Sequence, residues 1–195
     1  MLMTSGESKV EITKSYVGYT PPVDFAASIQ LLVRYVPPEY LVGLKRIILT
    51  NASGLSHEGR RERTWSRGKQ VRVADALAFY LKASPTFPAR IEIFVDNICN
   101  SRPPQLLRIP LLRHCVLANT LYHEIGHHIH ETMHPEYAER EAVATRWTRH
   151  LTTSFVKRRY WYLLPVAFVI TALFLATKLF LGKTRKSRGI LNSVA

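Results

Sequence analysis

Three side chains able to do chemistry, His123, Glu124 and His127, lie in an otherwise apolar stretch between Leu121 and His130. Side chains four residues apart on a helix share one face, about 5–6 Å apart at Cβ, so both imidazoles can bind one divalent ion. The carboxylate of Glu124 then lies beside that ion, where it can take a proton from bound water. Because burying unpartnered polar groups is costly, we predict metal ligation by the two histidines.

A catalytic zinc ion usually has three protein ligands, and the two histidines supply only two. We therefore look for a third ligand further along the chain. The candidates are His130, His134, Glu136, Glu139 and Glu141. A helix over residues 135–155 would turn Glu141 towards its apolar face and Glu139 towards a wetter one. We therefore predict Glu141 as the third ligand and keep Glu139 as the alternative. Gly126 and Ala144 are small, which would let the two helices approach closely.

The chemistry predicted for this set is peptide hydrolysis. A zinc ion bound by His123, His127 and Glu141 keeps one position for water and lowers the pKa of that water towards about 7. Glu124 would act as the general base and then pass the proton to the leaving amine. The donor for the oxyanion stays open among Tyr122, Tyr137, His134 and His150. We expect His114 and His128 to be packing or surface residues.

The spacing of apolar and polar residues predicts the secondary structure of the first half of the chain. Apolar residues recur at three and four over residues 23–36 and predict a helix that ends at Pro37. Residues 42–51 predict a buried strand, residues 58–72 a solvated charged loop, and residues 74–83 a short helix.

The second half contains the elements that must position the site. Residues 89–98 alternate between apolar and polar and predict a half-buried strand. Helical spacing runs from residue 106 to 130, with Pro110 marking a kink or the true start. Pro135 suits the first turn of a further helix.

Composition predicts contact with an anionic partner, because Lys and Arg outnumber Asp and Glu by 27 to 14. Residues 160–177 carry no charge over 18 positions, about 27 Å as a helix, and begin with aromatic residues suited to a headgroup boundary. We expect a transmembrane or membrane-associated helix here. Cations flank both sides, so its orientation is left open. Cys99 and Cys115 lack CxxC spacing and are expected to be buried free thiols.

The domain organisation predicted from these patterns has four parts. They are a flexible arm over residues 1–22, a metallopeptidase domain over 23–156, a hydrophobic membrane-associated helix over 157–182 and a basic tail over 183–195. The mixed order of helices and strands predicts an α+β fold. The first twenty residues lack the apolar run of a secretory signal, so we expect the catalytic domain on the cytoplasmic side.

The two motifs together resemble a known family. "HEIGHH" followed by "EREAVA" is similar to the His-Glu-x-x-His plus Glu-x-x-Ala arrangement of gluzincin-type zincin metallopeptidases, most like the compact ImmA/IrrE-like minimal peptidases. The resemblance covers about residues 40–155. It implies a compact zincin-like domain, whose small mixed sheet packs on the motif helix. It also implies that residues 90–98 form the edge strand to which an extended peptide adds. Thr145 stands where the family often has an acidic or amide residue that orients a ligand histidine.

The function predicted is therefore a membrane-associated zinc metallopeptidase acting on a protein or peptide, with membrane lipid as a second partner. The alternative is a zinc-stabilised membrane protein that has lost turnover and acts as a binding or regulatory module, a reading that the Thr145 departure favours. A nucleic-acid partner is not expected, because the basic stretch Arg60–Arg72 belongs to no nucleic-acid-binding motif.

Overall fold

The computed structural model describes residues 10–66, 69–136 and 140–163. The chain divides into two units, Met1–Phe155 and Val156–Ala195. The first unit contains the sheet, the helices that cover it and every residue of the predicted site that the structure describes.

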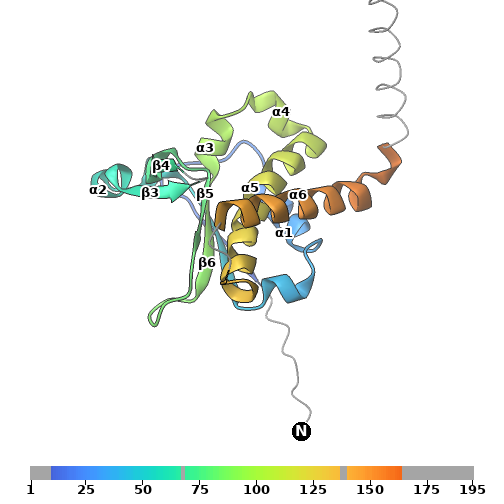
Figure 1. Cartoon of the computed structure of the whole chain (residues 1–195). Coiled ribbons are helices and arrows are strands. Elements are labelled where there is room, and N and C mark those ends of the chain that lie inside the picture. The colour runs from blue at the N-terminus through green and yellow to red at the C-terminus, as the bar shows by residue number, and fades with distance from the viewer. Residues whose placement is uncertain (1–9, 67–68, 137–139, 164–195) are drawn as a thin grey trace, which may run out of the picture. The chain divides into compact units, whose positions relative to one another are not determined.

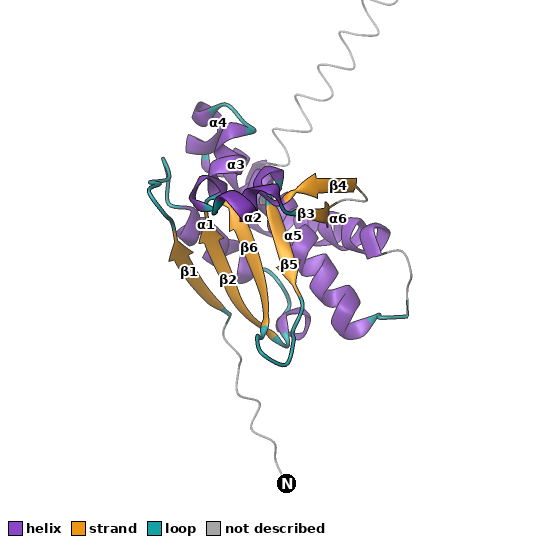
Figure 2. Cartoon of the chain, turned by 90° about the vertical axis from the view of Figure 1, so that its left-hand side faces the viewer, coloured by secondary structure: helices purple, strands orange, loops and turns teal. Residues whose placement is uncertain are grey.

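A four-stranded mixed sheet lies at the centre of the first unit (Figure 2). Its strands are β1 (Glu11–Ser15), β2 (Leu44–Thr50), β5 (Ala78–Leu81) and β6 (Ala89–Phe94), in the spatial order β1-β2-β6-β5. The first three strands in that order run parallel, and β5 runs antiparallel to β6. The predicted α+β class is therefore confirmed.

Three helices lie on one side of this sheet (Figure 1). They are α1 (Phe25–Val33), α5 (Pro110–Met133) and α6 (Arg140–Arg159). The first two contact the sheet, while α6 crosses α5. The shorter elements are the helices α2 (His57–Arg61), α3 (Val95–Asn100) and α4 (Pro104–Arg108), the hairpin strands β3 (Arg63–Ser66) and β4 (Lys69–Arg72), and 3-10 turns at Pro38–Leu41, Ala52–Gly54, Val73–Asp75 and Trp161–Leu163. The strand alternation predicted over residues 89–98 is confirmed for residues 89–94 in β6, where Ile91 and Ile93 are fully buried. It is wrong for residues 95–98, which belong to helix α3.

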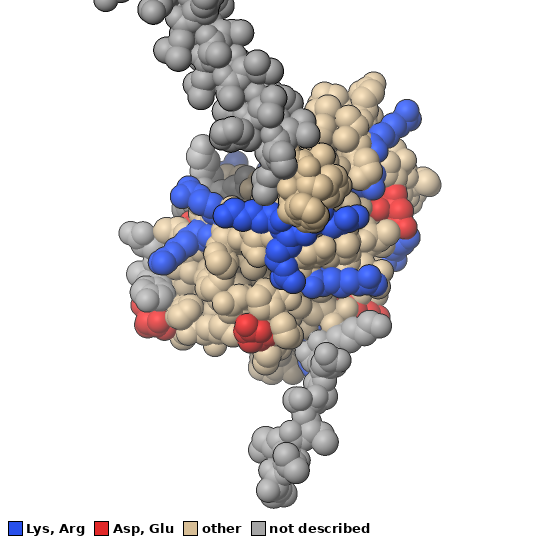
Figure 3. Space-filling model, turned by 90° about the vertical axis from the view of Figure 1, so that its right-hand side faces the viewer, with Lys and Arg blue, Asp and Glu red and all other residues tan. Residues whose placement is uncertain are grey.

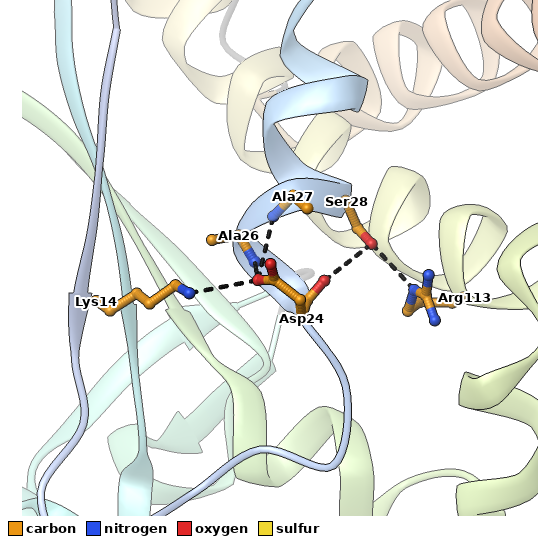
Figure 4. Close-up of polar contacts among 6 residues, drawn as sticks. All are labelled: Lys14, Asp24, Ala26, Ala27, Ser28 and Arg113. Carbon is orange, nitrogen blue, oxygen red and sulfur yellow. Dashed lines mark hydrogen bonds and ion pairs between the residues drawn. The ribbon is translucent and has the colours of Figure 1, made fainter.

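The start of α1 is tied both to the sheet and to α5 (Figure 4). Asp24 caps the helix by accepting from two N–H groups of its first turn at 3.1 and 3.3 Å. The bond from the Ala27 N–H, and to a lesser degree Lys14, hold the pKa of Asp24 below its usual value. Ser28 in turn accepts from Nε of Arg113 on α5, at 3.0 Å. These contacts fix α1 against the helix that carries the motif.

Residues 11–15, predicted to belong to a flexible arm, instead form β1, so the prediction is wrong there. Its backbone pairs in register with β2, from Glu11 opposite Arg46 to Ser15 opposite Thr50. The side chains of Glu11 and Arg46 also form an ion pair at 3.0 Å. A partner more than thirty residues away leaves no periodic signal in so short a polar segment. Residues 1–9 of the predicted arm lie outside the described residues.

Two other predictions are wrong for the same physical reason. The charged loop predicted over residues 58–72 contains α2 and the β3–β4 hairpin, and the helix predicted over residues 74–83 contains β5. Alignment of β5 with β6, together with an aromatic contact between Phe79 and Phe94 at 5.7 Å, outweighs the local helix propensity.

The strand predicted over residues 90–98 is not an edge strand. β6 lies between β2 and β5, so β5 is the edge of the sheet next to α5. The error follows from the preceding one, because a helix over residues 74–83 would have left β6 without a second neighbour.

The long C-terminal helices agree with prediction only in part, because Pro135, expected in the first turn of the last helix, lies in a turn outside α6 (Arg140–Arg159). Pro110 begins α5, as one of the two readings expected. Of the predicted apolar segment 160–177, the structure describes residues 160–163, which include the turn Trp161–Leu163, and the rest of that segment lies outside the described residues. Among the helices described, none is both long enough and apolar enough to cross a membrane.

Candidate metal centre and hydrolytic site

The motif lies in the middle of α5, where the helix crosses the sheet. Its neighbours Leu121 and Ile125 are fully buried, which draws the polar side chains between them out of solvent. His123 is only 5% exposed and Glu124 only 7% exposed, whereas the His127 side chain is 20% exposed. The motif therefore passes from the core to the surface over one helical turn.

Glu141 reaches this turn from α6. One carboxylate oxygen lies 3.3 Å from Nε2 of His123, and the other lies 3.6 Å from Nε2 of His127. The possible ligand atoms of the three residues all lie within 4.8 Å of one another. The structure thus brings together the two histidines and the carboxylate that the sequence predicted as one set.

The close approach of the two helices depends on Gly126. A Cβ atom on this residue would lie 2.8 Å from both Cα and the carbonyl oxygen of Ala144 on α6. Two small residues facing each other let the helix backbones touch, as the sequence predicted for this pair. The approach positions Glu141, one turn before Ala144, over the motif.

The donor set fits a divalent transition metal. Two imidazole nitrogens and one carboxylate oxygen form a common three-ligand set for zinc, leaving a fourth position for water or substrate. Other first-row divalent ions accept the same donors, so the set points to a class of ion, with zinc as its most usual member.

The pKa of His127 lies below its usual value, chiefly because the ring is buried. Glu141 opposes this shift, while electrostatic interactions with His130 and Arg140 add to it. The ring is therefore neutral at neutral pH. Only the neutral imidazole has a free lone pair for a metal, so the surroundings favour the ligating form.

Thr148 is a further residue of this centre that sequence reasoning did not single out. Its hydroxyl lies 3.5 Å from Nδ1 of His123 and donates to the carbonyl of Ala144 at 2.7 Å. Because the Thr148 hydroxyl already donates its proton, it can only accept a hydrogen bond from the Nδ1–H group of His123. That tautomer would leave the lone pair of His123 on Nε2. The available signal was spacing, because Thr148 lies two turns after Glu141. Thr145, the departure noted in the sequence, is exposed.

A cleft of about 530 Å³ opens beside the cluster. Glu124, His127 and Glu141 form part of one wall, and β5 with the following residue Lys82 forms the other. Glu124 therefore faces the same cavity as two of the three clustered residues, which is where a general base must lie to reach a reacting molecule.

The other candidates for the third ligand do not join the cluster. His134 and Glu136 contact each other at 3.4 Å beyond the end of α5, with both side chains more than 40% exposed. His130 is buried and lines the cleft, but it lies outside the group of three. Glu139 falls outside the described residues.

The candidates for an oxyanion donor are mostly misplaced. The prediction of Tyr122 as a possible oxyanion donor is wrong, because this residue is fully buried and its hydroxyl donates to the carbonyl of Leu32 at 3.0 Å. His134 and His150 do not line the cleft, and Tyr137 falls outside the described residues. The described cleft wall offers His130 and Arg140 instead.

His114 and His128, expected to be packing or surface residues, both pack in the interior. His128 is fully buried, with Nδ1 3.1 Å from the hydroxyl of Tyr80 and Nε2 3.0 Å from the carbonyl of Val42. It thereby joins the motif helix to edge strand β5. His114 is also buried. Both cysteines are free thiols as predicted, although they are half-buried rather than fully buried.

Comparison of the chain with protein-family models, with characterised proteins and with solved structures found no match.

Proposed function

We propose that the chain is a zinc-dependent metallopeptidase of the zincin type. The observation that carries the proposal is the cluster of His123, His127 and Glu141, with ligand atoms within 4.8 Å of one another, beside a cleft that Glu124 also lines. The likeness of the two motifs to gluzincin-type peptidases supports the same reading.

Each side chain has a distinct role in this proposal. His123, His127 and Glu141 hold the ion, which when bound would supply Lewis acidity and lower the pKa of water. Glu124 accepts a proton from the attacking water and returns it to the leaving amine, as a general base and then a general acid. Thr148 positions His123 through its Nδ1 atom.

The substrate class that fits the cleft is an extended peptide. In the part of the sheet that the structure describes, β5 pairs with β6 along one side and with no strand along the other, and its residues Ala78–Leu81 line the cleft. An edge strand offers N–H and C=O groups to an added strand, which would hold a peptide alongside Glu124 without a fixed sequence. The peptide thus pairs with β5 in this proposal, and not with β6.

A second candidate function is a zinc-stabilised binding or regulatory module without turnover. The exposure of Thr145, where the related motifs often have an acidic or amide residue, favours this candidate. The two candidates share metal binding and the edge strand, and they differ only in whether Glu124 transfers protons.

Glu141→Gln is expected to lower the affinity for zinc, because a neutral amide replaces an anionic ligand. Loss of a residue that only supports a ligand typically costs about 10–100-fold in metal affinity, so loss of a ligand should cost at least as much. The measurement is elemental analysis of the purified full chain after dialysis against a zinc buffer. Glu136→Gln, an exposed acid nearby, should keep wild-type zinc content. Retention of zinc by Glu141→Gln, with loss by Glu139→Gln, would show that the alternative acid is the ligand.

We also propose that the chain associates with a membrane through its C-terminal part. In the second unit, the exposed cations Lys157, Arg158 and Arg159 precede Trp161 and Tyr162, which are 66% and 50% exposed. Cations next to exposed aromatic rings suit a headgroup boundary. Flotation of the full chain with lipid vesicles tests this, with binding expected to be lost on deletion of residues 160–181. Equal flotation of both forms would contradict it.

A further inference from the structure

A second cavity, separate from the proposed metal centre, lies between α1 and the first turn of α5. We call it the α1–α5 cavity. Its volume is about 310 Å³, and its lining includes the side chains of Arg34, Arg113 and His114. No Asp or Glu is present among the described residues that line it. The cavity therefore presents the two permanent positive charges of Arg34 and Arg113, and no carboxylate is among its described lining residues.

One wall is a stripe along α1. Ala27, Gln30 and Arg34 recur at three and four residues, so their side chains lie along one face of the helix. The methyl group of Ala27 leaves space, while Gln30 and Arg34 are exposed and supply amide and guanidinium N–H donors. The side chain of Arg34 forms no ion pair within the part of the chain that the structure describes.

The opposite wall contains a guanidinium group that is already oriented. Nε of Arg113 donates to Ser28 at 3.0 Å, and Nη1 donates to the carbonyl of Leu107 at 3.0 Å. Guanidinium has five N–H donors, so three remain, including both on Nη2. Figure 4 shows Arg113 reaching Ser28 from the α5 side, whereas the carboxylate of Asp24 is engaged by Lys14 and the helix cap. The Asp24 carboxylate therefore does not neutralise Arg113, and the guanidinium charge can act on a bound anion.

We propose that the α1–α5 cavity binds a phosphate group. Guanidinium groups match the geometry of phosphate oxygens and hold them in charge-assisted pairs. The same chemistry is found in a soluble phosphate ester and in the headgroup of an anionic phospholipid. Figure 3 shows lysine and arginine side chains gathered over the middle of one face of the molecule. Over the whole sequence Lys and Arg outnumber Asp and Glu by 27 to 14, an excess of positive charge that would attract an anion from either source.

Binding by the full-length chain tests the proposal, with neutral detergent present for the soluble probes and removed before vesicle flotation. The soluble probes are inorganic phosphate and glycerol phosphate, titrated by calorimetry, and the lipid probe is flotation with phosphatidylglycerol vesicles against phosphatidylcholine vesicles. Arg34→Gln should weaken binding about tenfold or more, by removal of a charge-assisted donor. Gln30→Glu should weaken it by a similar factor, because it adds a carboxylate. Both positions are exposed, so the fold should be kept.

Arg102→Gln provides the control, since it removes one exposed arginine outside the cavity. Binding of the soluble probes with selective loss in the two cavity variants supports a free phosphate ligand. Selective loss seen only with phosphatidylglycerol vesicles supports a lipid headgroup. The proposal is overturned if no probe binds, or if Arg34→Gln and Gln30→Glu bind as Arg102→Gln does.

Discussion

Glu124→Gln is expected to lower the rate of peptide hydrolysis by about 10²–10⁴-fold, the usual contribution of a general acid and base. The amide keeps the size of the side chain but cannot accept a proton from water. Because Glu124 is not one of the three clustered residues, zinc content and thermal stability should stay close to wild type. The measurement is cleavage of an unstructured protein substrate, alongside elemental analysis of the same preparations.

The control for this change is Glu39→Gln, which alters an exposed acid outside the cleft and should leave cleavage unchanged. The result separates the two proposed functions. If the wild-type chain binds zinc but cleaves no substrate, the chain is a binding module. If cleavage persists in Glu124→Gln at the wild-type rate, then Glu124 is not the base and the proposed chemistry is wrong.

The elements that the sequence predicted well are those whose signal is local. α1, α5 and β6 each carry a clear period of buried residues, and Pro110 marks the start of α5. The elements that it missed depend on partners far along the chain. β1 has a mixed polar sequence and forms because β2 offers it an open edge, while β5 has local helix propensity and forms because β6 aligns it. Periodicity contains no information about such pairing.

The residues of the candidate site also divide into those with a local sequence signal and those that depend on distant contacts. His123 and His127 share a helix face by spacing alone, and the inward stripe of the next helix selected Glu141 without knowledge of the fold. The roles of Thr148 and of β5 needed coordinates, because Thr148 contacts His123 across two helices and the edge position of β5 depends on strand order. Tyr122 was misplaced because an apolar stripe does not say which polar atom at its border faces a cavity.

Gly126→Ala is expected to destabilise the fold and to weaken zinc binding, although alanine favours a helix over glycine by about 1 kcal/mol. The added Cβ would lie 2.8 Å from two backbone atoms of Ala144, closer than van der Waals contact allows. Overpacking costs about 1–3 kcal/mol when side chains can adjust, and a helix backbone adjusts less easily. The clash therefore outweighs the propensity, and we expect a net loss of about 2 kcal/mol in the free energy of unfolding.

The same clash should weaken zinc binding. To avoid it, α6 must move away from α5, and this movement carries Glu141 away from His123.

Ala144→Gly should not rescue the Gly126→Ala variant, since the added methyl meets backbone atoms of Ala144 that glycine also has. Chemical denaturation and zinc titration of Gly126→Ala, Gly126→Ala/Ala144→Gly and the control Gly59→Ala measure both effects. In Gly59→Ala the new Cβ meets only side-chain atoms, the nearest at 3.3 Å, so unfolding and zinc binding should remain near wild type. Full rescue by Ala144→Gly, or wild-type zinc affinity in Gly126→Ala, would show that backbone contact at this crossing does not hold Glu141 over the two histidines.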